Sequence, residues 1–161
     1  MPRLRFLFFS ILAAAVLSQP LSGFDEAYVK RGEPQRDRRG WVEHADCGAA
    51  VRDGARLVLR ADFGSVTVNP GQSDRVECRI RLRVFRSSED EAKRFFRRVE
   101  LTAHSLEGGG LSISEKYPRE QERNGWSAAD FEFAVPQRFN IDIETKGAVS
   151  PSATLTAKCV P

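Results

Sequence analysis

Residues 75–86 read RVECRIRLRVFR, and this stretch decides the expected fold. Apolar side chains occupy every second position from Val76 to Val84, and charged side chains occupy the positions between them. A period of two is typical of a β-strand that has one buried face and one solvated face. The sequence therefore predicts a domain built around a long strand over residues 75–86.

Shorter stretches with the same alternation lie on both sides of this strand. They cover residues 56–60, 65–69, 131–135 and 141–143. Residues 101–105 and 111–114 flank three glycines, Gly108 to Gly110, and this arrangement predicts a β-hairpin. Gly and Pro punctuate the chain between these stretches, as expected for short strands joined by turns.

One amphipathic helix is expected directly after the long strand. Residues 88–91 read SEDE, which is a capping box of the kind that begins helices. Apolar side chains follow at the spacing of one helix face, at Ala92, Phe95, Phe96 and Val99. The predicted fold class is therefore mainly β, with short antiparallel strands and one amphipathic helix.

The first 18 residues predict export. Arg3 and Arg5 precede an apolar run over residues 6–17, and small residues and a proline follow it, as in a secretory signal peptide. The run is too short to cross the ~30 Å hydrocarbon core as a lasting anchor. We expect a signal peptide over residues 1–18 and a mature protein in the periplasm, in the medium or at the cell surface, with no stable membrane span.

Charge and length limit the remaining function classes. The chain has 25 Lys and Arg against 22 Asp and Glu, and two of the arginines belong to the signal peptide, which leaves 23 minus 22, or +1. This balance disfavours a nucleic-acid partner, which requires a clustered basic excess. We predict a polar leader over residues 19–46, one β-rich domain over residues 47–150 and an irregular or truncated tail over residues 151–161.

Three cysteines would enter an oxidising compartment. They are Cys47, Cys78 and Cys159. A disulfide between Cys47 and Cys78 would stabilise the fold by about 3–4 kcal/mol in the chain-entropy model. The sequence supports equally that Cys78 is an apolar core residue without a disulfide.

The residue types needed for catalysis are scarce. His44 and His104 are the two histidines, and the run His44 to Cys47 has no second pair of ligands to complete a metal site or a nucleophile. The glycines at 108–110 lack the following Lys-Ser/Thr of a phosphate-binding loop. The sequence therefore predicts no enzyme, no metal site and no cofactor.

The charged face of the long strand is the candidate binding surface. Its arginines are Arg75, Arg79, Arg81 and Arg83, which together could grip an acidic polysaccharide or a lipid head group. The alternative, which we favour, is cross-strand pairing with acidic residues of later strands. Those residues are Asp130, Glu132, Asp142 and Glu144.

Two stretches carry a family resemblance. Residues 57–68, LVLRADFGSVTV, and residues 133–149, FAVPQRFNIDIETKGAV, resemble motifs of a bacterial family of exported proteins described as adhesins. The resemblance covers about residues 51–150 and implies solenoid-like strands punctuated by Gly turns, with no catalytic residues. Members of that family continue through more such turns, so the chain resembles a truncated member.

These observations predict an exported, non-enzymatic, adhesin-like interaction module of the cell envelope with an unidentified partner. The alternative is a periplasmic module that binds acidic glycans or lipids through Arg75, Arg79, Arg81 and Arg83.

Overall fold

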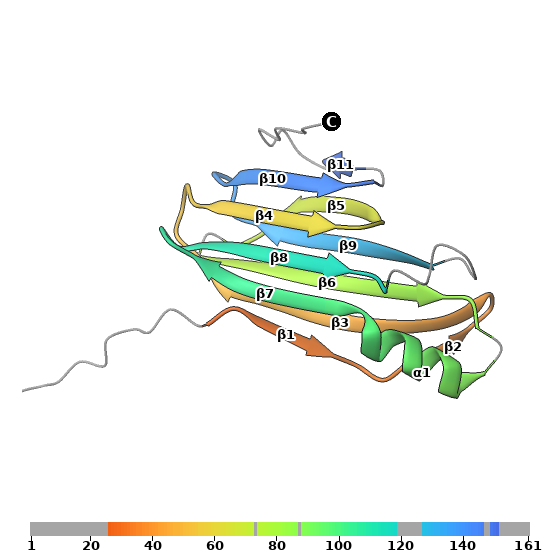
Figure 1. Cartoon of the computed structure of the whole chain (residues 1–161). Coiled ribbons are helices and arrows are strands. Elements are labelled where there is room, and N and C mark those ends of the chain that lie inside the picture. The colour runs from red at the N-terminus through yellow and green to blue at the C-terminus, as the bar shows by residue number, and fades with distance from the viewer. Residues whose placement is uncertain (1–25, 73, 87, 119–126, 147–148, 152–161) are drawn as a thin grey trace, which may run out of the picture.

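Two β-sheets face each other, and a short helix covers one end of the space between them (Figure 1). The computed structural model describes residues 26–72, 74–86, 88–118, 127–146 and 149–151. The mainly β fold with one helix is confirmed within these ranges. Apolar side chains from both sheets and from the helix form one core.

The larger sheet has seven strands. Its order is β1 (Tyr28–Arg31), β3 (Gly40–Ala50), β6 (Arg75–Val84), β9 (Ser127–Val135), β5 (Ser65–Pro70) and β11 (Val149–Pro151), and β2 (Gln35–Asp37) pairs with one end of β3. The smaller sheet has four strands, in the order β10 (Asn140–Thr145), β4 (Arg56–Ala61), β8 (Gly110–Lys116) and β7 (Glu100–Leu106).

The long predicted strand is β6, at the middle of the larger sheet. It pairs antiparallel with β3 on one side and with β9 on the other. The side chains of Val76, Ile80 and Leu82 are fully buried, because the alternation points them into the space between the sheets. The strand ends at Val84, two residues earlier than the sequence pattern suggested.

Three units, each a pair of consecutive strands, have the first strand in the smaller sheet and the second strand in the larger one. They are β8 with β9, β4 with β5, and β10 with β11, and neighbouring units pair in parallel in both sheets. Gly64 makes the β4–β5 turn possible: its φ is +150°, and a Cβ there would lie 2.2 Å from the carbonyl oxygen of Ala129. The solenoid-like architecture stays a prediction, because a solenoid would continue through further units and the described residues contain these three.

The expected hairpin and helix are both present. Strands β7 and β8 pair antiparallel around residues 107–109. Helix α1 (Glu89–Arg98) begins at the predicted cap, where Ser88 Oγ accepts a hydrogen bond from the Glu91 N–H at 3.3 Å. Its buried side chains, Ala92, Phe95 and Phe96, pack toward β3 and β6.

The predicted polar leader over residues 19–46 is wrong for its described part. The chain forms β1 and β2 there and begins β3 at Gly40. The sequences of β1 and β2 are polar because these strands are largely exposed to solvent and because the partly buried side chain of β1 is a charged one, Arg31. Arg31 Nε donates to Glu43 Oε1 at 2.5 Å, and its other nitrogens donate to the carbonyls of Phe96 and Val99 at the end of α1. The ordered domain therefore begins well before residue 47.

The irregular tail was predicted to begin at residue 151, but residue 151 belongs to β11. The predicted signal peptide, its cleavage site, Cys159 and residues 152–161 lie outside the described residues. In the described ranges no helix has the length and apolar character needed to cross a bilayer.

Candidate interaction surface

The four arginines proposed as a binding face lie along β6 on the outer side of the larger sheet. Arg83 forms an ion pair with Asp130 of β9 at 2.9 Å, and Arg81 forms one with Asp37 of β2 at 3.1 Å. Arg75 lies 3.7 Å from Glu77 on its own strand. The outer face of β6 is therefore largely balanced by acidic neighbours.

Arg79 completes this pattern through the strand register. Asp46 of β3 lies opposite it on one side, and Glu132 of β9 lies opposite it on the other. Charges of alternating sign on neighbouring strands attract one another across a sheet. A polyanion approaching Arg79 would therefore also meet two carboxylates.

The acidic residues of β10 have a different partner from the one considered in the sequence analysis. Asp142 and Glu144 lie in the smaller sheet and bind Arg60 of β4, at 3.1 and 3.0 Å. The hydrogen bond from Arg60 lowers the pKa of Asp142. Of the two strands that carry these acidic residues, β9 is paired with β6 in the larger sheet, whereas β10 belongs to the smaller sheet.

The residues considered for catalysis are dispersed. Cys47 and Cys78 lie opposite each other on β3 and β6 with their Cα atoms 4.9 Å apart, and they form a disulfide. Cys47 therefore has no free thiol to pair with His44, and His104 lies in the other sheet on β7. Among the residues that the structure describes, no three His, Cys, Asp or Glu side chains are grouped to hold a metal ion.

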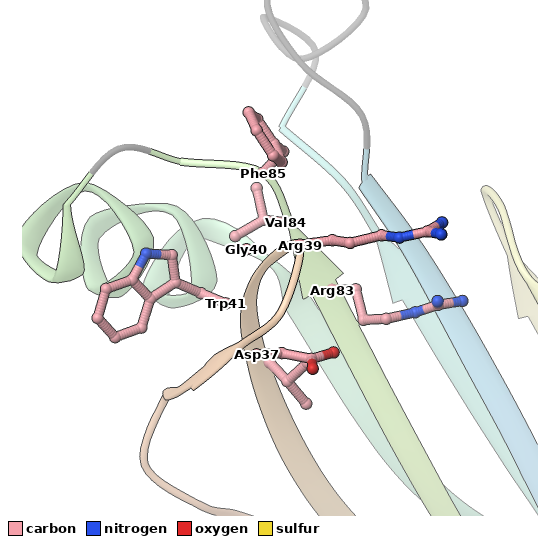
Figure 2. A pocket seen from close by; sticks show the side chains of 8 residues that line it. Asp37, Arg39, Gly40, Trp41, Arg83, Val84 and Phe85 are labelled. Atoms are coloured by element: carbon pink, nitrogen blue, oxygen red, sulfur yellow. The ribbon is translucent and has the colours of Figure 1, made fainter.

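A hollow lies where the β2–β3 turn meets the end of β6 (Figure 2). Its volume is about 300 Å³. Phe85 is 62% exposed at its edge, whereas Val42 and Val84 are buried. The lining residues are Asp37, Arg39, Gly40, Trp41, Val42, Arg83, Val84 and Phe85.

Glycine is required directly after this turn, at the first residue of β3. Gly40 has φ of +156°, and a Cβ there would lie 2.4 Å from the carbonyl oxygen of Val84. The close approach brings the β2–β3 turn against the end of β6. The hollow is therefore built by two segments more than 40 residues apart in the chain.

Arginines surround the apolar lining. The Arg36 guanidinium lies over the Trp41 ring, 5.2 Å from its centre, which is within the range of a cation–π contact. Figure 2 shows Arg39 and Arg83 extending in the same direction, with the Trp41 ring turned the other way. The surface thus joins aromatic groups to guanidinium groups, a combination typical of binding hot spots.

The one acidic residue of the lining is already engaged. The Asp37 carboxylate accepts hydrogen bonds from the Arg38 N–H at 2.6 Å and from Arg81 at 3.1 Å. The first of these bonds is the main cause of the lowered pKa of Asp37, and Arg81 adds to it. Within the described residues no ion pair engages Arg36 or Arg39, so positive charge predominates here.

The hollow was not predicted from the sequence, although the sequence contains one signal for it. Phe85 follows the outward positions Arg79, Arg81 and Arg83 in the alternation of β6, at a position where a charged residue would be expected. An exposed aromatic side chain becomes a candidate contact residue where it continues an apolar surface, as Phe85 does beside this hollow.

A second unusual group is buried and serves the fold. Glu115 on β8 is 1% exposed, and its Oε2 accepts a hydrogen bond from the Asp62 N–H at 3.0 Å. The Asp62 carboxylate in turn accepts from the Tyr117 N–H at 2.9 Å. Burial raises the pKa of Glu115 to about 8. The carboxyl group holds the β4–β5 turn against β8 and is closed to ligands.

Comparison with protein-family models, with curated proteins and with solved structures finds no match to this chain.

Proposed function

We propose that the chain is an exported, non-enzymatic, adhesin-like interaction module of the cell envelope, and that it contacts its partner at the Trp41–Phe85 hollow. The observation that carries this proposal is the exposed Phe85 beside an apolar hollow rimmed by arginines. Aromatic and arginine side chains are enriched in the contact residues that contribute most to binding. The resemblance of residues 51–150 to exported adhesins supports the same class of function.

Export is supported by the sequence of residues 1–18 and by the disulfide between Cys47 and Cys78. Disulfides persist in oxidising compartments outside the cytosol. Mass spectrometry of the protein from its native host should find an N-terminus between Gln19 and Phe24. A soluble cytoplasmic form that retains Met1 would contradict export.

The non-enzymatic assignment is supported by the arrangement of reactive groups. His44 and His104 lie on different sheets, and both described cysteines are joined in the disulfide. The most perturbed carboxyl group, Glu115, is enclosed in the core and holds a turn. The disulfide and Glu115 have structural roles, and none of these groups lines the hollow.

The contact site can be tested with isolated cell envelopes of the native host. We expect the labelled wild-type domain to be retained on envelopes, and Phe85→Ser to lower this retention at least tenfold. Tyr28→Ser is the matched control, because Tyr28 is also an exposed aromatic residue but lies on β1, away from the hollow. Equal retention of the Phe85→Ser variant and the wild type would refute the hollow as the contact site.

Binding of acidic glycans or lipids through Arg75, Arg79, Arg81 and Arg83 is the alternative function. The ion pairs to Asp37 and Asp130 and the acidic neighbours of Arg79 place it second. The double variant Arg79→Gln/Arg81→Gln should bind a heparin resin as weakly as the wild type does. Salt-sensitive retention of the wild type that the double variant loses would reverse this ranking.

A further inference from the structure

We infer that the partner at the Trp41–Phe85 hollow is an anionic lipid of the envelope, with part of an acyl chain in the hollow and the head-group phosphate on Arg39. This inference rests on the proposed function and names the ligand class of the same site. It follows from two independent properties of the site, its apolar lining and its excess of positive charge.

The lining favours a hydrocarbon group. Phe85 and the Trp41 ring supply exposed apolar surface beside the buried Val42 and Val84, and glycans need several hydrogen-bonding groups to fix their hydroxyls. The volume of about 300 Å³ is at the lower end of small-molecule sites. It accommodates a segment of an acyl chain more readily than a folded protein surface.

The charge around the hollow favours an anionic head group. Arg38 and Arg39 form the β2–β3 turn, and the carboxylate next to them in the chain, Asp37, is already bound to Arg81 and to the Arg38 N–H. Guanidinium groups bind phosphate oxygens with two parallel hydrogen bonds. Aromatic rings beside basic residues are also the groups that lie at the surface of lipid bilayers.

The experiment measures binding to vesicles of phosphatidylglycerol and of phosphatidylcholine at equal low salt, by co-sedimentation. We expect the wild type to bind phosphatidylglycerol at least tenfold more tightly. The variant Arg38→Gln/Arg39→Gln, which removes both arginines of the β2–β3 turn, should weaken that binding about 25-fold, since each basic residue near an anionic surface contributes about fivefold. The matched control, Arg75→Gln/Arg79→Gln, removes two arginines of the same sheet from the outer face of β6 and should bind like the wild type.

Chain insertion has its own readout. Trp41 and Trp126 are the two tryptophans, so Trp126→Phe leaves Trp41 as the only fluorophore. Phosphatidylglycerol with brominated acyl chains should quench Trp41 strongly, and Phe85→Ser should reduce this quenching. Circular dichroism melting of each variant verifies that the fold is retained.

Three results would overturn the inference. Equal losses in the two double-arginine variants would show general charge attraction, and absent bromine quenching would place the acyl chain elsewhere. No vesicle binding by the wild type, together with Phe85-dependent retention on envelopes, would reject the lipid and leave the proposed function standing with a protein partner. Retention on envelopes that does not depend on Phe85 would reject the proposed contact site itself.

Discussion

Replacing the buried Glu115 by Gln should change how the stability of the domain depends on pH. Glu115 is 1% exposed on the inward face of β8, and its pKa is raised from 4.5 to about 8 by burial. The neighbouring carboxylate of Asp62 also raises this pKa, whereas the Asp62 N–H, which donates to Glu115 Oε2 at 3.0 Å, lowers it. The folded state therefore favours the protonated carboxyl group near neutral pH.

The sign of the effect follows from linkage. Because the pKa is higher in the folded state than in the unfolded state, the free energy of unfolding is largest below pH 4.5 and falls as the pH rises to about 8. The slope is about 1.4 kcal/mol per pH unit while the unfolded state alone is ionised. The loss is roughly 3 kcal/mol between pH 5.5 and 7.5, which is a large part of the stability of an ordinary domain.

The amide of Gln keeps an oxygen for the Asp62 N–H and does not ionise. Its NH₂ group replaces Oε1, which has no hydrogen-bond partner among the described residues, and this change adds an offset that is the same at every pH. We therefore expect urea unfolding at constant ionic strength to show a variant that gains about 3 kcal/mol on the wild type between pH 5.5 and 7.5. Both proteins contain the same two histidines, so their contribution cancels in the difference.

Glu132→Gln provides the control, because Glu132 is an exposed carboxylate on β9. This variant should follow the pH dependence of the wild type. Parallel curves for the wild type and the Glu115→Gln variant from pH 5.5 to 7.5 would refute the reasoning, since they would show that Glu115 is ionised in both states or in neither.

Three further stability effects follow from the packing, and urea unfolding measures each of them. Arg31→Met should cost about 3 kcal/mol because it leaves Glu43 buried without its cation, and adding Glu43→Leu should recover most of the loss; a cost below about 1 kcal/mol would contradict the ion pair's role. Removing the disulfide with Cys47→Ala/Cys78→Ala should cost about 3–4 kcal/mol, because the bond closes a loop with a sequence separation of 31. Phe96→Ala should cost about 3–5 kcal/mol, and a melting temperature within two degrees of the wild type would show that the ring is not a core residue.

Elements with a strong local pattern were predictable. Strand β6, helix α1 and the β7–β8 hairpin follow from periodicity, capping and turn residues that lie within a few positions of one another. Strands β1 and β2 were not predictable in this way, because their side chains are mostly polar and their partner strand β3 supplies the hydrogen bonds. An edge strand with a solvated face carries little hydrophobic pattern of its own.

The candidate site was less accessible to sequence reasoning. The arginines of β6 were located correctly on one face, but Phe85, which continues that face, was not recognised as a contact residue. The hollow also needs Trp41 and the β2–β3 turn before Gly40, which approach the end of β6 through close packing of Gly40 on Val84. No spacing along the chain predicts such a contact.

The sequence by itself determined which face of β6 and of the other alternating strands is apolar, where the helix begins and which side chains carry charge. These properties depend on the backbone geometry of neighbouring residues, which has the same period in every strand and helix. The tertiary structure alone decided which charges meet. Asp130 and Asp142 stand in similar alternating strands, yet Asp130 lies beside Arg83 and Asp142 beside Arg60, because strand order and register bring together residues that are far apart in the chain.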